Sequence, residues 1–325
     1  MDTKFRRKFN KPKYQELDTG KSTSKLRSLS NNAQLYLIML PVLIHIFIFC
    51  YIPMYGLVIA FQDYYPGKPF IAFDGSVKWV GLKHFTEFIQ GPYFKRLMVN
   101  TFRLSFFYFA FGFFIPILFA LLINELRDGF FKKFVQTASY LPYFISTVVV
   151  AGMVLSFINV DGMVNTIIQA FGREPIPLNT DPNYYPAIYT ITNIWRTFGW
   201  NSILYLSAMA SVDPSLYEAA RVDGANRFEQ MIHITIPSIQ STIFVLLIFA
   251  IGGLLSANTE FILLTYNPAV YETADVIGTY VYRDGLLGGN FSSGTAVSII
   301  TSTINFALLY IANTISRKYS DYALW

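Results

Sequence analysis

Six long apolar runs constrain this sequence more than any other feature. Each has about 20 residues or more, enough to cross a hydrocarbon core of about 30 Å as an α-helix. A membrane-spanning β-strand needs only about 9–11 residues in alternation, so we expect helices. The sequence therefore predicts an all-α membrane protein with six transmembrane helices. The runs are Leu35–Phe61, Val99–Ile123, Ala138–Ile158, Ala187–Ala210, Ile239–Leu264 and Thr295–Ile315.

The composition agrees with lipid rather than water as the main solvent. Only 14% of the residues are charged and 53% are hydrophobic, whereas about 25% are charged in a soluble domain. The first apolar run far exceeds the core of a cleaved signal peptide, about 7–15 residues, so it is expected to be a span. The fourth run is the least apolar, and a strict hydropathy window would miss it.

The net charge of +5 is concentrated before the first run. A basic arm beside a span is more simply explained as a topogenic signal, which sets the orientation of the span, than as a nucleic-acid site. Because Lys and Arg outside the spans favour the same side as this arm, both termini are expected in the cytoplasm. We divide the chain into a basic cytoplasmic arm (1–34), a six-helix domain (35–316) and a cytoplasmic tail (317–325). The basic residues of the arm are Lys4, Arg6, Arg7, Lys8, Lys11, Lys13, Lys21, Lys25 and Arg27.

The short polar stretch Tyr217–Pro237 lies between the fourth and fifth runs, on the predicted cytoplasmic side. It contains Glu218-Ala219-Ala220, then Gly224, Ile234 and Ile236-Pro237. This spacing resembles the cytoplasmic loop E-A-A-x3-G-x9-I-x-L-P of binding-protein-dependent ABC import permeases. The one departure is isoleucine at position 236, where the family usually has leucine. The alternative is a plain helix–turn–helix connection between two spans.

Local residue chemistry predicts a pair of helices in this loop, at 213–237. Asp213 is suited to cap a helix that begins at Pro214. Glu218 is expected in the first turn, where the helix dipole favours an anion. Gly224 permits a positive φ and is expected to end the first helix. Residues 227–236 are expected to form the second helix, and Pro237 to mark the entry to the fifth span.

The resemblance implies that this loop couples the permease to a separate ATPase. The only P-loop-like stretch here, Gly20-Lys21-Ser22, has Gln15 where the motif needs its first glycine. The three histidines show no metal or triad spacing. We therefore expect a non-catalytic permease without a cofactor or metal, with ATP and Mg²⁺ bound by the partner ATPase. The candidate coupling residues are Glu218, Ala219, Ala220, Asp223, Gly224, Ile234 and Pro237.

Within the ABC importers, the sequence of the loop Tyr217–Pro237 and the stretch WVGLKHFTEFI at Trp79–Ile89 are most similar to the sugar-importing group. That stretch is expected to be an interfacial helix or an ordered loop. The resemblance implies a bacterial cytoplasmic-membrane importer for a sugar, in particular an oligosaccharide. Its partners would be a second homologous permease, two ATP-binding subunits and an extracytoplasmic solute-binding protein, working by alternating access.

Polar residues inside the predicted spans are candidates for the substrate path, because charges at membrane depth usually face a cavity or a partner. Flat aromatic faces, amides and charges together suit a sugar. Arg103 and Glu260 are expected at similar depths, where they could form a salt bridge or line the cavity. The candidates are Arg103, Asn193, Trp195, Arg196, Asn258 and Glu260.

Two rival functions remain open from the sequence. The same architecture could import an amino acid, a peptide or an anion, against which only the wording of the loop argues. An ion-coupled secondary transporter would show internal repeats and broken helices near the midplane. It would also leave the loop at 217–237 unexplained.

Overall fold

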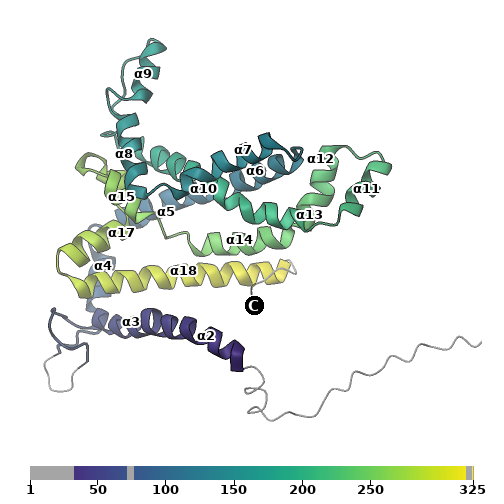
Figure 1. The fold of residues 1–325 in the computed structure, drawn as a ribbon. Helices are drawn as coiled ribbons and strands as arrows, with labels where there is room; N and C mark the ends of the chain where they lie inside the picture. The colour runs from purple at the N-terminus through teal and green to yellow at the C-terminus, as the bar shows by residue number, and fades with distance from the viewer. Residues whose placement is uncertain (1–32, 72–76, 320–323, 325) are drawn as a thin grey trace, which may run out of the picture. The chain divides into compact units, whose positions relative to one another are not determined.

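The computed structural model describes residues 33–71, 77–319 and 324, which form helices and their connections (Figure 1). Among these residues an isolated bridge between Gln62 and Trp79 is the only extended pairing. The predicted all-α class is therefore confirmed. The chain divides into two compact units, Met1–Gly56 and Leu57–Trp325. The predicted basic arm lies almost wholly outside the described residues, as does much of the predicted tail.

The first predicted span is helical from end to end. It consists of α2 (Ala33–Ile46), the π-helix η1 (Phe47–Tyr51), α3 (Ile52–Met54) and the 3₁₀-helix η2 (Tyr55–Phe61). The π turn comes just before Pro53, which has no N–H to donate to the helix.

A short surface helix follows, α4 (Lys83–Gln90), within the stretch expected to form a helix or an ordered loop. Asp63 anchors the chain that leads to it, with its carboxylate 2.9 Å from Lys78 Nζ and 3.4 Å from Lys83 Nζ. The hydrogen bond from Lys78, assisted by Lys83, holds the pKa of Asp63 below its usual value.

The second span is longer than predicted. Helices α5 (Phe94–Gly112) and α6 (Phe114–Glu125) together form a 32-residue candidate span, which extends the predicted Val99–Ile123 at both ends.

The third predicted span, Ala138–Ile158, is wrong as one continuous helix. The chain forms α7 (Phe130–Tyr140), η3 (Leu141–Phe144), α8 (Thr147–Ile158) and α9 (Met163–Ala170). Ile145 and Ser146 are extended, and Ser146 Oγ caps α8 by accepting from Val149 N–H. Pro142 and this cap give the break its physical reason.

The fourth predicted span corresponds closely to α10 (Tyr185–Ala210), an unbroken helix of 26 residues. The fifth, Ile239–Leu264, is wrong as one helix. Helix α14 (Gln240–Gly252) ends before an irregular segment, and α15 (Thr259–Thr265) begins after it. Small and polar residues explain the interruption: Gly253 follows α14, and Asn258 caps α15 by accepting from Phe261 N–H.

Four short helices connect α15 to the last span: η5 (Pro268–Val270), α16 (Tyr271–Ala274), α17 (Ile277–Tyr280) and η6 (Val281–Leu287). The last span is α18 (Phe291–Tyr319), which packs along α14 (Figure 1).

The predicted count of six spans remains a prediction. Among the described residues four helical stretches are long and apolar enough to cross a membrane, namely Leu35–Phe61, Phe94–Glu125, Thr147–Ala170 and Phe291–Lys318. A fifth is the pair Arg227–Ser238 and Gln240–Gly252, bent by 63°. Helix α10 would be the sixth, because its 26 residues suffice in length despite its polarity.

Helix α10 is the packing centre of the second unit. Its N-terminal half joins a core with α5, α8 and α15, through Leu104, Val150, Tyr189 and Phe261. Its other half joins a core with α6 and the start of α14, through Ala120, Tyr205, Met209 and Ile239. Helices α8, α14 and α15, which belong to the two interrupted spans, therefore pack on the unbroken helix α10.

A buried carboxylate ties α5 to the connecting helices. Asp275 is fully buried, with Oδ2 2.9 Å from Arg96 Nη2 and Oδ1 3.0 Å from Arg283 Nη1. Thr279 Oγ1 donates to the same carboxylate at 2.8 Å. The hydrogen bond to Asp275 raises the pKa of Arg283.

We predict that Gly199→Ala weakens the packing of α7 on α10. A Cβ at position 199 would meet the carbonyl oxygen of Ser139 on α7, and such overpacking costs about 1–3 kcal/mol. The midpoint of thermal unfolding of the purified complex should fall. Gly152→Ala, in α8 with no atom within 4 Å of the added Cβ, is the matched control. An equal effect of both substitutions would contradict the close approach.

Candidate substrate cavity and coupling loop

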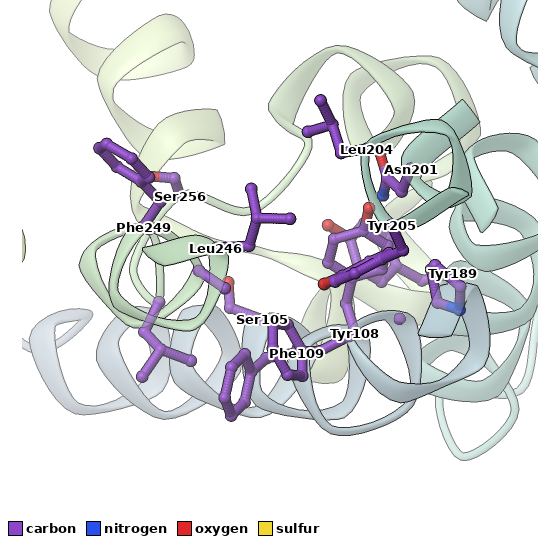
Figure 2. A pocket seen from close by; sticks show the side chains of 16 residues that line it. Ser105, Tyr108, Phe109, Tyr189, Asn201, Leu204, Tyr205, Leu246, Phe249 and Ser256 are labelled. Carbon is purple, nitrogen blue, oxygen red and sulfur yellow. The ribbon is translucent and has the colours of Figure 1, made fainter. Parts of the chain in front are cut away.

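A cavity of about 380 Å³ lies between α5, α6, α10, α14 and the irregular segment that follows α14. Figure 2 shows aromatic rings and polar groups gathered around it, with Tyr108 and Phe109 on α5 and Asn201 and Tyr205 on α10. The lining also includes Tyr189, Ser105 and Ser256, but no lysine or arginine. This mixture of flat rings, hydroxyls and an amide suits a sugar.

One hydroxyl of the wall lacks a partner. Ser105 Oγ is buried, and no described residue forms a hydrogen bond with it. A buried hydroxyl without a partner is costly, and a ligand hydroxyl would satisfy it. Tyr108, by contrast, is held by a 3.0 Å hydrogen bond to Thr197.

In the irregular segment beside the cavity, residues 253–258, two backbone N–H groups donate to side chains of other helices. Leu255 N–H donates to Asn305 Oδ1 at 3.1 Å, and Asn258 N–H donates to Tyr189 Oη at 2.8 Å. Non-helical backbone at membrane depth is tolerated only where it is buried in protein or lines a cavity. This segment lines the cavity through Gly253, Leu254 and Ser256.

Two of the predicted path residues form a structural link beside the cavity. Asn258 Nδ2 donates to Asn193 Oδ1 at 2.8 Å, and Asn193 Nδ2 donates to the carbonyl of Tyr189 at 2.8 Å. Asn193 is buried and does not line the cavity. The two amides therefore position Tyr189, which does line it.

Two further path residues, Arg196 and Glu260, are joined by a threonine that sequence reasoning missed. Arg196 Nη1 donates to Thr147 Oγ1 at 2.9 Å, and Thr147 Oγ1 donates to Glu260 Oε2 at 3.0 Å. Arg196 Nη2 also donates to the carbonyl of Ile145 at 3.3 Å. We call Arg196, Thr147 and Glu260 the relay. It fastens the starts of α8 and α15 to the middle of α10.

The salt bridge considered between Arg103 and Glu260 does not occur among the described residues, since Glu260 accepts from Thr147 instead. Arg103 and Trp195 line a second cavity of about 760 Å³, also bounded by α5 and α10. The six candidates thus fall into two hydrogen-bonded groups and this second cavity.

No sequence signal separated Tyr108, Tyr189 and Tyr205 from the many other aromatics. Gly253, Ser256 and Asn258 inside an apolar run were a usable signal of the break.

The first loop helix, α11 (Pro214–Val222), has the predicted caps. Asp213 accepts from Ser215 N–H at 2.9 Å, and this bond lowers the pKa of Asp213. Gly224 has φ 86°, and the bonds Gly224 N–H to Arg221 O and Ala225 N–H to Ala220 O close the helix end. The expectation for Glu218 was wrong. It lies in the second turn, because the helix starts at Pro214, so the dipole argument does not apply.

The second loop helix is also confirmed, as α12 (Arg227–Gln230), the π-helix η4 (Met231–Thr235) and α13 (Ile236–Ser238). Asn226 caps it in a reciprocal box with Glu229. Pro237 lies inside α13, and the bend of 63° into α14 follows at Ile239. The bend therefore comes two residues after Pro237, at the predicted first residue of the fifth run, Ile239.

Two side-chain contacts hold the loop in place, one between its two helices and one to α6. Tyr217 Oη lies 3.0 Å from Thr235 Oγ1, which joins the two loop helices. Arg227 Nη1 donates to the carbonyl of Glu125 at 3.2 Å, at the end of α6. A force on the loop would therefore reach both α6 and α14.

Residues 112–321 match the family described as "Binding-protein-dependent transport system inner membrane component". The chain belongs to this family. It is accordingly a multi-pass membrane permease of ABC import type. The matched range contains α11, α12, α10 and the irregular segment, but only the last residue of α5, Gly112.

Two relatives from Bacillus subtilis (strain 168) match almost the whole chain. The "Polygalacturonan/rhamnogalacturonan transport system permease protein YteP" is 43% identical and covers 92% of each chain. "Protein LplB" is 39% identical and covers 95% of this chain and 96% of its own.

Solved structures of similar fold come from an alginate transporter. One is described as "a bacterial ABC transporter involved in the import of the acidic polysaccharide alginate", with TM-score 0.81 and 40% identity. It covers 91% of this chain and 99% of that chain. A second is that transporter "in complex with alginate pentasaccharide-bound periplasmic protein", also with TM-score 0.81 and 40% identity, covering 92% of this chain and 99% of that chain.

We predict that Thr147→Val destabilises the permease while Thr147→Ser does not. Valine keeps the shape but removes both relay hydrogen bonds, and bonds to charged groups contribute about 1.5–3 kcal/mol each. Serine retains the hydroxyl. The measurements are the midpoint of thermal unfolding and the ATPase rate of the assembled transporter. Equal losses in the two variants would show that the methyl group, not the relay, matters at this position.

Proposed function

We propose that this permease forms, with a second permease, the membrane path for an oligosaccharide that contains uronic acid. The supporting observation is 43% identity, over 92% of both chains, to a permease named for polygalacturonan and rhamnogalacturonan transport. The similar solved fold of an alginate importer supports the same substrate class. A sugar would be delivered by an extracytoplasmic binding protein, as in the alginate complex.

The cavity of Tyr108, Tyr189, Tyr205 and Asn201 is the proposed sugar-contacting surface of this chain. Aromatic faces cover the C–H surfaces of pyranose rings, while hydroxyls and the amide satisfy the sugar hydroxyls. No cation lines this cavity. The second permease is therefore proposed to supply charge for the carboxylates. The asparagine link and the relay would support these walls rather than touch the sugar.

We further propose that the loop of α11 and α12 docks on a separate ATP-binding subunit, which holds ATP and Mg²⁺. The side chains of Val222 and Phe228 are 88% and 67% exposed, an apolar surface that a partner would cover. Glu218 and Ala219 are exposed beside them. Both termini and this loop would lie in the cytoplasm. Closure of two ATP-binding subunits would then move α6 and α14 around the cavity.

We predict that acidic oligosaccharides stimulate ATP hydrolysis by the reconstituted transporter. The preparation contains this chain, the second permease, the ATP-binding subunits and the binding protein. Oligogalacturonates should stimulate, neutral maltooligosaccharides should not, and vanadate should block uptake. Stimulation by neutral sugars alone would remove the uronate assignment. Vanadate-resistant uptake would instead favour an ion-coupled transporter. Stimulation by peptides would exclude a sugar as the substrate.

We predict that Gly224→Pro and Glu218→Lys abolish ATP-coupled uptake while the protein remains in the membrane. Proline cannot adopt φ 86°, and lysine reverses the charge of the docking surface. Gly172→Pro, at φ 74° in a loop predicted outside, and Glu174→Lys are matched controls. Normal uptake by both coupling variants would exclude the coupling role.

A further inference from the structure

The second cavity differs in chemistry from the sugar cavity. It is a groove of about 760 Å³ along α5 and α10, with apolar residues over most of its wall. Phe111 and Ile191 are 54% and 68% exposed. The lining residues are Arg103, Phe107, Phe111, Ile115, Asn183, Pro186, Ala187, Thr190, Ile191, Ile194, Trp195 and Phe198. A wall of this kind favours a hydrocarbon chain over a sugar.

The polar groups of the groove lie at one end. Arg103 is on α5 about 10 Å from the middle of the span Phe94–Glu125, at 1.5 Å per residue. It therefore lies inside the hydrocarbon core but near its border, about 15 Å from the middle. Helical side chains lean toward the N-terminus, so Arg103 can extend to that border. Asn183 lines the groove just before α10 begins.

Arg103 forms no hydrogen bond or ion pair with any residue that the structure describes. A guanidinium at this depth costs several kcal/mol unless an anion or water reaches it. Thr190, on α10, lines the opposite wall of the groove. Its Oγ1 is buried and has no hydrogen-bond partner among the described residues. An unpaired cation and an unsatisfied hydroxyl thus border one apolar groove, and a ligand with an anionic oxygen would satisfy both.

We propose that this groove binds an anionic phospholipid. Arg103 pairs with the lipid phosphate near the membrane border, and Thr190 offers its hydroxyl to the glycerol and phosphate oxygens. An acyl chain lies along Phe107, Phe111 and Ile191 toward the middle of the membrane. The lipid thereby neutralises a charge that would otherwise face hydrocarbon, and it bridges α5 and α10. The occupant is anionic because the groove offers a cation and no carboxylate.

The first test measures lipid binding to the assembled, delipidated transporter by native mass spectrometry. We expect phosphatidylglycerol to bind better than phosphatidylcholine. Arg103→Gln should weaken phosphatidylglycerol binding about tenfold or more, since the variant loses a charge-assisted hydrogen bond to the phosphate, and should remove the preference. Arg103→Lys should retain much of it. The control is Arg173→Gln, an exposed loop arginine outside the groove. Equal phosphatidylglycerol binding by the Arg103→Gln and Arg173→Gln variants would overturn the proposal.

The second test identifies the occupant of the groove in native membranes. Photo-crosslinkable p-benzoyl-phenylalanine replaces Ile191, and the mass of the irradiated chain is measured. A gain equal to one phospholipid supports the proposal. A crosslink to a protein subunit, or displacement of phosphatidylglycerol by trigalacturonate in the first test, would assign the groove to a partner helix or to the substrate and would overturn it.

Discussion

The requirement that every backbone polar group find a partner in the absence of water governs this fold. Two predicted spans break, at residues 145–146 and 253–258, and α10 supplies side chains to both breaks. Arg196 donates to the carbonyl of Ile145, and Tyr189 accepts from the N–H of Asn258. The interruptions are therefore stable because one unbroken helix carries polar groups at the right depths.

The same constraint explains why α10 is too polar for a hydropathy test and yet central. The residues that lower its hydropathy, such as Asn193 and Arg196, act between helices and not toward lipid. The cavity lies beside α10, at the point where α14 ends and the irregular segment begins. The asparagine link holds the start of α15 to α10 next to Tyr189, a residue of the cavity wall. Polar residues within the membrane thus serve first to shape the walls that a sugar would meet.

Much of the fold could be predicted from the sequence, because the membrane limits the choices. The helical class, the limits of α10, the cap at Asp213 and the turn at Gly224 all follow from short-range rules. The helix breaks were missed because apolar length alone does not reveal them. The role of Thr147 could not be predicted either. A hydroxyl in an apolar run usually bonds its own helix, and its two charged partners lie 49 and 113 positions away. The lining tyrosines were missed because rings suit a lipid border equally well.

The buried carboxylate of Asp275 has a consequence for how the chain is made. Its partner Arg96 precedes it by 179 residues. At about 5–20 residues per second, a ribosome needs about 9–36 s to synthesise the residues between Arg96 and Asp275. During this interval α5 waits in the translocation machinery or the bilayer with its arginine unmatched. The third residue of a helix is a tolerable place for such a wait, because the side chain can stay at the water boundary. Assembly of this end of the molecule is therefore postponed until about five-sixths of the polypeptide, up to Asp275, has been made.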